Sequence, residues 1–152
     1  MRRDNRLSRM LHVLIHMSEH EEPMTSETVA AMLSTNPVVA RRTMAGLRDA
    51  GLLTSKKGHG GGWALAAPLR SITLLDVYRA LGDPAIFAFG HADDQPQCLV
   101  EQAINDRLSA TLDEAKALLL AQFGRITLAD IAADFEEKLK VTPWNRKPEA
   151  CR

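Results

Sequence analysis

The fold is decided by residues 36–66, which read NPVVARRTMAGLRDAGLLTSKKGHGGGWALA. Asn36 followed by Pro37 is a strong helix start, because an asparagine side chain can accept a hydrogen bond from an unpaired backbone amide and proline at the first helical position loses none. The helix predicted from this point runs to about Ala50, and Gly51 ends it. The stretch therefore opens with a helix of about four turns.

The two sides of this helix differ in chemistry. At 100° per residue, one side carries Ala40, Met44, Leu47 and Gly51, while the other carries Val38, Arg41, Ala45 and Arg48, with Arg42 beside them. The first side is predicted to pack on a core. The second is predicted to present guanidinium groups to a partner.

Two short strand-like runs, residues 52–56 and 63–66, follow the helix, and residues 57–62 between them read KGHGGG. This pattern predicts a β-hairpin with a glycine-rich, basic tip. A glycine-rich loop can also hold nucleotide phosphates, but here no strand precedes it in a βαβ context and no helix begins after it. We therefore interpret the loop as the tip of a hairpin.

Two further helices are predicted upstream. The first has apolar residues at three- and four-residue spacing from Leu7 to Met17, and Pro23 follows its end. The second is short and is capped by Thr25 or Ser26. Three short helices followed by a hairpin are typical of a winged helix-turn-helix domain.

A DNA interface is predicted on the third helix and the hairpin. Cations against phosphates supply most of the affinity for DNA, and side chains in the major groove read its sequence. The candidate contacts are Val38, Arg41, Arg42, Thr43 and Arg48 on the helix, and Lys56, Lys57 and His59 in the hairpin. The alternative is a solvated basic helix face beside a flexible surface hairpin.

The charge is distributed unevenly along the chain. The whole sequence has 19 basic and 19 acidic residues, but residues 1–70 carry 10 basic against 6 acidic, and residues 71–152 carry 9 against 13. A basic half joined to an acidic half suggests a polyanion-binding module fused to something else, although chance scatter gives offsets of this size. Four early arginines, Arg2, Arg3, Arg6 and Arg9, either add phosphate contacts or form a solvated terminus.

The second half is predicted to be helical. A helix over residues 72–81 is capped by Thr73 with Asp76, and a loop over residues 85–97 leads to a long helix from about Cys98 to Gln122. The long helix has a heptad-like seam of Ile104, Leu108, Thr111, Ala115, Leu118 and Gln122. At 1.5 Å per residue it is roughly 35–40 Å long, which is more than a 70-residue winged helix can cover. We expect a second copy of the helix to cover it.

The predicted fold class is therefore mainly α with a small β-hairpin wing. A winged helix-turn-helix domain over residues 1–70 is followed by residues 71–140, which hold a linker helix, a loop, the long dimerisation helix and a last helix starting at Thr127. Residues 141–152 are predicted to be an irregular tail.

Composition excludes several protein classes. The chain of 152 residues is 45% hydrophobic, enough for one core, but it has no apolar run of about 18 residues and no signal peptide. We therefore expect a cytoplasmic protein with no membrane contact. Two cysteines, Cys98 and Cys151, do not make a disulfide scaffold and suit a reducing compartment.

Two functional classes remain after a search for catalytic patterns. No Ser/His/Asp, paired-carboxylate or nucleotide-binding constellation is present, so we do not expect an enzyme. The rival to a DNA-binding regulator is a winged-helix module that binds proteins and not specific DNA. Arg41 and Arg42 beside a basic wing favour DNA.

The residues described so far resemble the Rrf2 family of bacterial winged-helix regulators. The resemblance rests on three features: the predicted third helix, which is the recognition helix of this family, a wing of the form G-x-G-G-G-aromatic-x-L, and the helix ITLLDVYRAL at residues 72–81. It extends over about residues 7–135. It implies a homodimeric transcription regulator, in most cases a repressor, that places two recognition helices over a palindromic operator. By motif position it implies DNA contacts from Arg41, Arg42 and Thr43, and from Lys57, His59, Gly60 and Gly61 in the wing.

The sequence departs from the cluster-binding members of that family. Those members carry three cysteines around the start of the long helix, whereas only Cys98 stands there in this chain. An iron–sulfur cluster ordinarily needs three or four protein ligands, so we expect no cofactor and place the chain with the cluster-free branch. A cluster shared between two subunits, with His91 or Asp93 as further ligands, is the one arrangement left open.

Cys98 has two interpretations. A thiol at a helix N-terminus has its thiolate stabilised by the helix dipole, which suits a redox or electrophile sensor. The alternative is a small buried residue at a packing junction. His91, Asp93, Asp94 and Cys98 fall within eight residues, but their spacing matches no standard metal site, so we predict a polar loop and no metal there.

Overall fold

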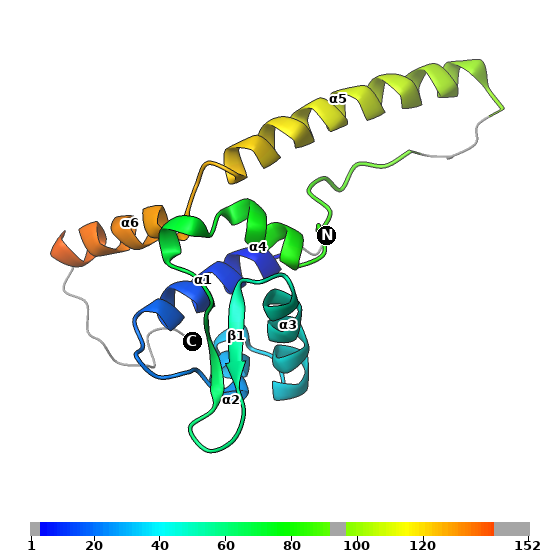
Figure 1. Ribbon diagram of the computed structural model, residues 1–152. Helices are drawn as coiled ribbons and strands as arrows, with labels where there is room; N and C mark the ends of the chain where they lie inside the picture. The colour runs from blue at the N-terminus through cyan, green and yellow to red at the C-terminus, as the bar shows by residue number, and fades with distance from the viewer. Residues whose placement is uncertain (1–3, 92–96, 142–152) are drawn as a thin grey trace.

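The computed structural model describes residues 4–91 and 97–141 of the chain. The described residues form six α-helices and one two-stranded antiparallel hairpin (Figure 1). In chain order the elements are α1 (Arg6–Ser18), α2 (Ser26–Leu33), α3 (Pro37–Asp49), β1 (Leu53–Lys56), β2 (Gly62–Leu65), the short 3₁₀ helix η1 (Leu69–Ser71), α4 (Leu74–Ala80), α5 (Leu99–Phe123) and α6 (Leu128–Val141). The predicted fold class is confirmed. The predicted tail lies outside the described residues from residue 142 onward.

The predicted helix starts are confirmed by their caps. The Thr25 hydroxyl accepts from the Thr28 amide at 3.1 Å, and the Asn36 side chain accepts from the Val39 amide at 2.9 Å. At α4, the Asp76 amide donates to the Thr73 hydroxyl while the Asp76 carboxylate accepts from the Thr73 amide. Each cap satisfies amides that a helix start leaves without partners, which contributes about 1 kcal/mol per cap.

The core lies between the first three helices and the base of the hairpin. The apolar face predicted for α3 is buried, with Ala40, Met44 and Leu47 fully inaccessible to solvent. Met10, Val13 and Leu14 of α1, Val29 of α2, Ile72, Val77 and Leu128 complete the fully buried set. Each large side chain in this set contributes roughly 1.5–3 kcal/mol through burial.

The hairpin is tied to the start of α2. Its strands pair from Leu53 with Leu65 to Lys56 with Gly62. Strand β1 therefore begins one residue later than the sequence predicts, and β2 begins and ends one residue earlier. Met24 extends the sheet, because its amide and carbonyl exchange hydrogen bonds of 2.8 and 2.9 Å with Trp63. The Trp63 indole is 6% exposed, and its Nε1 donates to the Ser26 hydroxyl at 3.0 Å.

Close packing against backbone atoms explains why two positions of the wing are glycines. A Cβ on Gly61 would lie 2.3 Å from the Lys56 carbonyl oxygen, and one on Gly62 would lie 2.6 Å from the Met24 carbonyl oxygen. Both distances are far below van der Waals contact, so neither position has room for a side chain. The glycine-rich tip that the sequence predicts is therefore required by packing at these two positions.

The other end of the molecule is built by the second half of the chain. The Leu74 amide donates to the Ile126 carbonyl at 2.9 Å, and the Leu128 amide donates to the Ile72 carbonyl at 2.9 Å. These bonds fix the start of α6 beside η1 and α4, whereas α5 projects away from the body (Figure 1). Phe123 at the end of α5 meets Tyr78 of α4 edge to face, with ring centroids 6.0 Å apart. Among the described residues no helix is both long and apolar enough to span a membrane.

Candidate nucleic-acid interface

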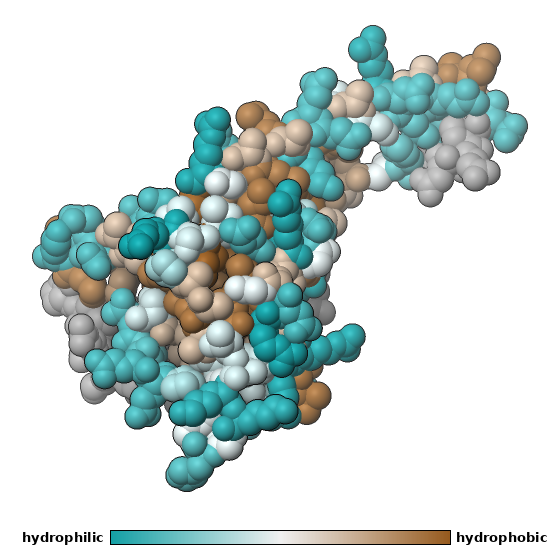
Figure 2. Space-filling model, viewed as in Figure 1, coloured by the Kyte–Doolittle hydropathy of each residue, from teal (hydrophilic) through white to brown (hydrophobic). Residues whose placement is uncertain are grey.

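The N-terminal part of α3 and the tip of the hairpin lie toward the same end of the molecule (Figure 1). Hydrophilic side chains gather over this end (Figure 2). At the start of α3, Val38 is 70% exposed and the side chain of Arg41 is 60% exposed; Arg42 is also exposed. The predicted outward face of α3 therefore does point to solvent at Val38, Arg41 and Arg48, and the opposite side fills the core. Ala45 was predicted on the outward face but is half-buried against the core.

The three arginines of α3 have different surroundings. Arg41 Nη2 lies 3.9 Å from Glu27 Oε1 of α2, whereas Arg48 Nη2 lies 2.9 Å from Asp49 Oδ1 of its own helix. No ion pair is recorded for Arg42 within the described part of the chain. Exposed pairs of this kind add little to the stability of the fold, so both pairs leave the guanidinium groups accessible to a partner. Arg48 lies in the last turn of α3, farthest from the end that carries the wing tip.

Thr43 uses its hydroxyl within the helix. Its Oγ1 donates to the Val39 carbonyl, four residues earlier, at 3.1 Å, and the side chain is half-buried. With its hydroxyl proton engaged within the helix, Thr43 can offer its methyl group to a partner. The methyl group suits an apolar contact, for example with a thymine methyl.

The wing places its cations at its tip. Lys56 ends β1, and Lys57, His59 and Gly60 are exposed in the turn that follows, while Gly61 is half-buried. Gly60 has a φ of 72° and Gly58 a φ of 91°, backbone conformations that residues with a Cβ adopt only with strain. The tip is therefore shaped by glycines, with the lysines and His59 directed outward.

The early arginines do not form one group. Arg9 is half-buried and donates from Nη1 to the Leu33 carbonyl at the end of α2, so it holds α1 against α2. Arg6 pairs with Asp4 at 2.7 Å, and the guanidinium lowers the pKa of that carboxyl group. For Arg9 the alternative of a solvated terminus is wrong, while a phosphate contact stays a prediction. Arg2 and Arg3 lie outside the described residues.

Two residues of this surface were missed by sequence reasoning. Val39 is 46% exposed on α3, and Glu27 approaches Arg41 from α2. The 100° spacing alone could have placed Val39 between the two helix faces. Glu27 could not be found in that way, because its contact depends on how α2 packs against α3.

A second exposed surface follows α5. All six residues of the predicted seam, Ile104, Leu108, Thr111, Ala115, Leu118 and Gln122, are exposed, with Leu118 at 66%. The half-buried residues of α5, at 101, 105, 109, 112, 119, 120 and 123, lie on a different side of the helix. The chain's own loop and α4 therefore contact one side of α5 and leave the seam uncovered. No residue of α5 is buried.

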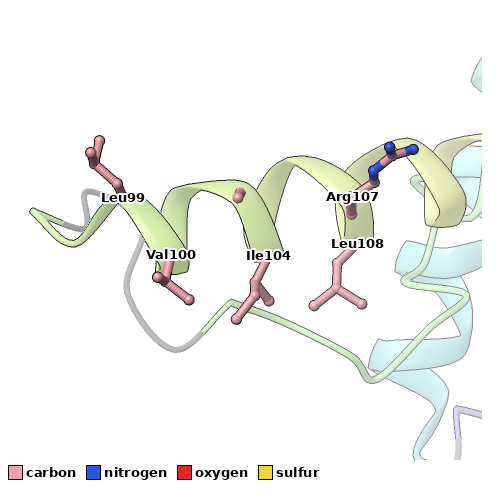
Figure 3. Close-up of a pocket in the computed structure, with 6 residues that line it drawn as sticks. Leu99, Val100, Ile104, Arg107 and Leu108 are labelled. Carbon is pink, nitrogen blue, oxygen red and sulfur yellow. The ribbon is translucent and has the colours of Figure 1, made fainter.

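Apolar side chains point the same way along the first half of this seam. Val100, Ile104 and Leu108 project to one side of α5, and Leu99 projects to another (Figure 3). Together with Ala103 and Arg107 they line a shallow hollow. An exposed apolar row of this length is uncommon on a monomeric soluble protein and marks an interaction surface.

Cys98 is the N-cap residue of α5 and is exposed, so its interpretation as a buried packing residue is wrong. The backbone amides of Glu101 and Val100 lower the pKa of its thiol. His91 Nε2 lies 3.0 Å from the Ser109 hydroxyl of α5. Within the described ranges no three His, Cys, Asp or Glu side chains come close enough to hold a metal ion, while Asp93 and Asp94 lie outside them.

The chain matches one protein family along most of its length. Residues 3–134 match the model of the Rrf2 family, which is described as an iron-dependent transcriptional regulator. The chain is 31% identical over 128 residues to YwnA of Bacillus subtilis strain 168, a candidate HTH-type transcriptional regulator; the match covers 84% of this chain and 95% of YwnA.

Solved structures share the fold. A candidate transcriptional regulator from Lactobacillus plantarum is 25% identical, with a TM-score of 0.71 and coverage of 86% of this chain and 89% of that one. IscR of T. potens is 23% identical, with a TM-score of 0.66 and coverage of 91% and 90%. At that identity the likeness to IscR concerns the fold alone.

Proposed function

The chain belongs to the Rrf2 family of transcriptional regulators, and from this premise we propose that it is a homodimeric repressor of a palindromic operator. The family relationship makes it a DNA-binding transcription regulator, and its relatives are regulators and not enzymes. The observation that carries the proposal is the shared direction of the exposed start of α3 and the basic wing tip (Figure 1). DNA binding assigns it to the compartment of the chromosome, the cytoplasm.

The α5 seam supports a homodimer. Its residues repeat in steps of four and three and are all exposed, while the chain's own contacts use another side of the helix. Such a repeat pairs two helices with their side chains interlocked. A closed two-fold dimer also explains why the chain leaves a 25-residue helix without a buried residue.

A two-fold dimer requires a palindromic site. Each α3 meets one half-site, and half-site centres lie about one DNA turn, 34–36 Å, apart or at a multiple of it. A dimer that covers such a site at a promoter blocks polymerase access to the same DNA. This steric argument is the reason for proposing a repressor.

The contacts are assigned by chemistry. Arg41 and Arg42 have the fork of donors that pairs with guanine O6 and N7, and Val38 and the Thr43 methyl suit thymine methyl groups. Arg48, at the far end of α3, is assigned to the DNA backbone after release from Asp49. In the wing, Lys56 and Lys57 are assigned to phosphates, and His59 with Gly60 and Gly61 to the adjacent minor groove.

Iron is not part of the proposal. The family description includes iron dependence, but the described residues of this chain contain one thiol, Cys98, and no group of three possible metal ligands. This donor set does not fit an iron–sulfur cluster held by one subunit, since such a cluster needs three or four protein ligands. We therefore assign no cofactor step to the mechanism.

Cys98 is the residue that we propose as the signal-responsive group. It is exposed, it begins the helix that carries the dimer seam, and its thiol has a lowered pKa. Oxidation or alkylation at this point adds bulk and polarity next to Leu99 and Val100, and so alters the edge of the dimer interface. Cys98→Ser is expected to make DNA binding insensitive to peroxide, and an unchanged response would remove Cys98 from this role.

The proposal is tested by titrating the protein on DNA from around its own gene, at fixed salt and with competitor DNA. Arg41→Ala with Arg42→Ala should weaken operator binding by about 100-fold or more, since each arginine–guanine pair contributes about 1–3 kcal/mol. Arg79→Ala with Arg125→Ala is the matched control, because it removes two exposed charges from α4 and from the turn between α5 and α6, outside the residues assigned to DNA. The dimer and its melting temperature should not change in either variant.

Two results would contradict the proposal. Equal operator affinity in the Arg41/Arg42 variant and its control would remove these residues from the interface. No preference of the wild-type protein for any site over scrambled DNA would favour the alternative, a winged-helix module that binds proteins.

A further inference from the structure

We propose that Glu27 is a positioning residue for Arg41, which holds the guanidinium for base reading and weakens binding to DNA of unrelated sequence. Glu27 lies in the first turn of α2, and its Oε1 is 3.9 Å from Nη2 of Arg41 on α3. Both side chains are mostly exposed, at 69% and 60%. The inference rests on the proposed DNA-binding function and concerns the specificity of the same surface.

The place of this carboxylate needs explanation. A basic surface that only had to grip phosphates would gain affinity from every added cation and would lose it with every nearby anion. Glu27 is nevertheless directed to the arginine at the outward start of α3. An acidic residue in the first turn favours its own helix by interacting with the helix dipole, but that role does not require contact with Arg41.

The contact has two expected effects on DNA binding. A carboxylate beside one edge of the guanidinium restricts the side chain, so Arg41 loses less conformational freedom when its other donors meet a guanine. The same carboxylate repels phosphates that approach Arg41, and the repulsion acts on DNA of every sequence. Correct base pairing with Arg41 offsets this repulsion, while an unrelated sequence does not.

The neighbouring arginine provides a contrast. Arg42 is exposed on the same helix, and no ion pair is recorded for it in the described part of the chain. We therefore expect the DNA contacts of Arg42 to be independent of Glu27. The base contact of Arg41 is expected to depend on Glu27.

The test measures affinity for the operator and for scrambled DNA of equal length at several salt concentrations. Glu27→Gln keeps the shape of the side chain and removes its charge. It should tighten binding to scrambled DNA by about three- to tenfold and reduce the ratio of operator to scrambled affinity by a similar factor. Glu136→Gln is the matched control, because it removes one exposed carboxylate on α6, outside the residues assigned to DNA, and should leave the ratio unchanged.

Two further variants separate positioning from repulsion. Glu27→Asp keeps the charge but shortens the side chain, so scrambled DNA should bind as before while the operator binds a few-fold more weakly. In an Arg41→Ala background, Glu27→Gln should no longer lower the preference for the operator. An unchanged effect in that background would show that Glu27 does not act through Arg41 and would overturn the proposal.

The outcomes also distinguish this inference from the proposed function. If the wild-type protein prefers its operator and Glu27→Gln behaves as Glu136→Gln does, only the role of Glu27 is wrong. If the wild-type protein shows no preference between operator and scrambled DNA, the proposed function fails and the role of Glu27 fails with it. Circular dichroism and melting curves of each variant establish that the differences are not caused by unfolding.

Discussion

The body and the long helix use apolar residues in opposite ways. On α3 the apolar side chains predicted to face the core, Ala40, Met44 and Leu47, are fully buried, whereas on α5 the seam is exposed, with Leu108 at 42% and Leu118 at 66%. Both rows follow from the same periodicity of the helix. The difference lies in what covers the two rows. In the body, α1, α2 and the hairpin cover α3, while the seam residues of α5 are exposed in the described part of the chain.

An apolar row on a helix belongs to the core when its own chain buries it, and it is available for assembly when its own chain leaves it exposed. The number of hydrophobic residues in the row does not decide between the two. The body has one apolar core, and among the described residues every buried side-chain nitrogen or oxygen atom has a hydrogen-bond partner. The α5 helix extends 25 residues, roughly 37 Å, with no buried residue. Stability of the body should therefore depend little on protein concentration, and the order of α5 should depend on it strongly.

The largest expected effect comes from placing charge in the seam. Ile104→Asp with Leu118→Asp should raise the dimer dissociation constant by about 1000-fold, because unpaired carboxylates would be buried in the interface at several kcal/mol each. Sedimentation velocity measures the change. Ala110→Asp with Ala117→Asp is the control, since both alanines are exposed on α5 outside the seam. A seam variant that stays dimeric at micromolar concentration would show that α5 is covered by something else.

The same truncation in each region should have two different outcomes. Leu14→Ala removes a fully buried side chain of α1 and should lower the free energy of unfolding by about 2–5 kcal/mol at any protein concentration. Leu118→Ala removes a side chain that is 66% exposed in the single chain. Its effect should be small for the monomer and should appear only where the dimer forms. Denaturation curves at several concentrations separate the two, and equal concentration dependence would contradict the comparison.

A smaller effect is expected at the junction of the wing and α2. Ser26→Ala leaves the buried Trp63 Nε1 without its acceptor, which should lower the free energy of unfolding by about 1–3 kcal/mol. Ser55→Ala, in the exposed strand β1, is the control and should change stability by less than about 0.5 kcal/mol. Dimerisation should be the same in both. Equal stability of the two variants would mean that the indole finds another acceptor.

Most of the fold could be predicted from local signals. The Asn36–Pro37 start, the Thr73 and Asp76 cap and the seam of α5 are set by neighbours within four residues, and the structure confirms the helices they predict. Local signals fail where two elements meet. The Arg9 contact with the end of α2 joins residues 24 positions apart, and the Met24 bridge to Trp63 depends on how the hairpin folds back.

The candidate site was predicted to a similar extent. Spacing on α3 identified which residues face outward, because one helix fixes that geometry by itself. It could not identify Glu27 beside Arg41, since that contact depends on the packing of α2 on α3. The glycines at 61 and 62 were predicted as part of the hairpin tip, but the reason for them, the backbone atoms of Lys56 and Met24 close by, depends on how the chain folds back. Prediction from sequence is thus strongest within an element and weakest between elements.

The smallest expected effect concerns Cys98, the N-cap residue of α5, at the end of the helix that lies away from the body (Figure 1). Because the amides of Glu101 and Val100 lower the pKa of the folded-state thiol, its thiolate should form at lower pH than in the unfolded chain. The stabilisation is present above the unfolded-state pKa and is lost as the pH falls through the folded-state pKa. In a Cys151→Ser background, the alkylation rate of Cys98 by iodoacetamide should reach half its plateau at lower pH in the native protein than in denaturant. Equal midpoints would mean that the helix start does not activate the thiol, and the proposed signal response would then need a group outside α5.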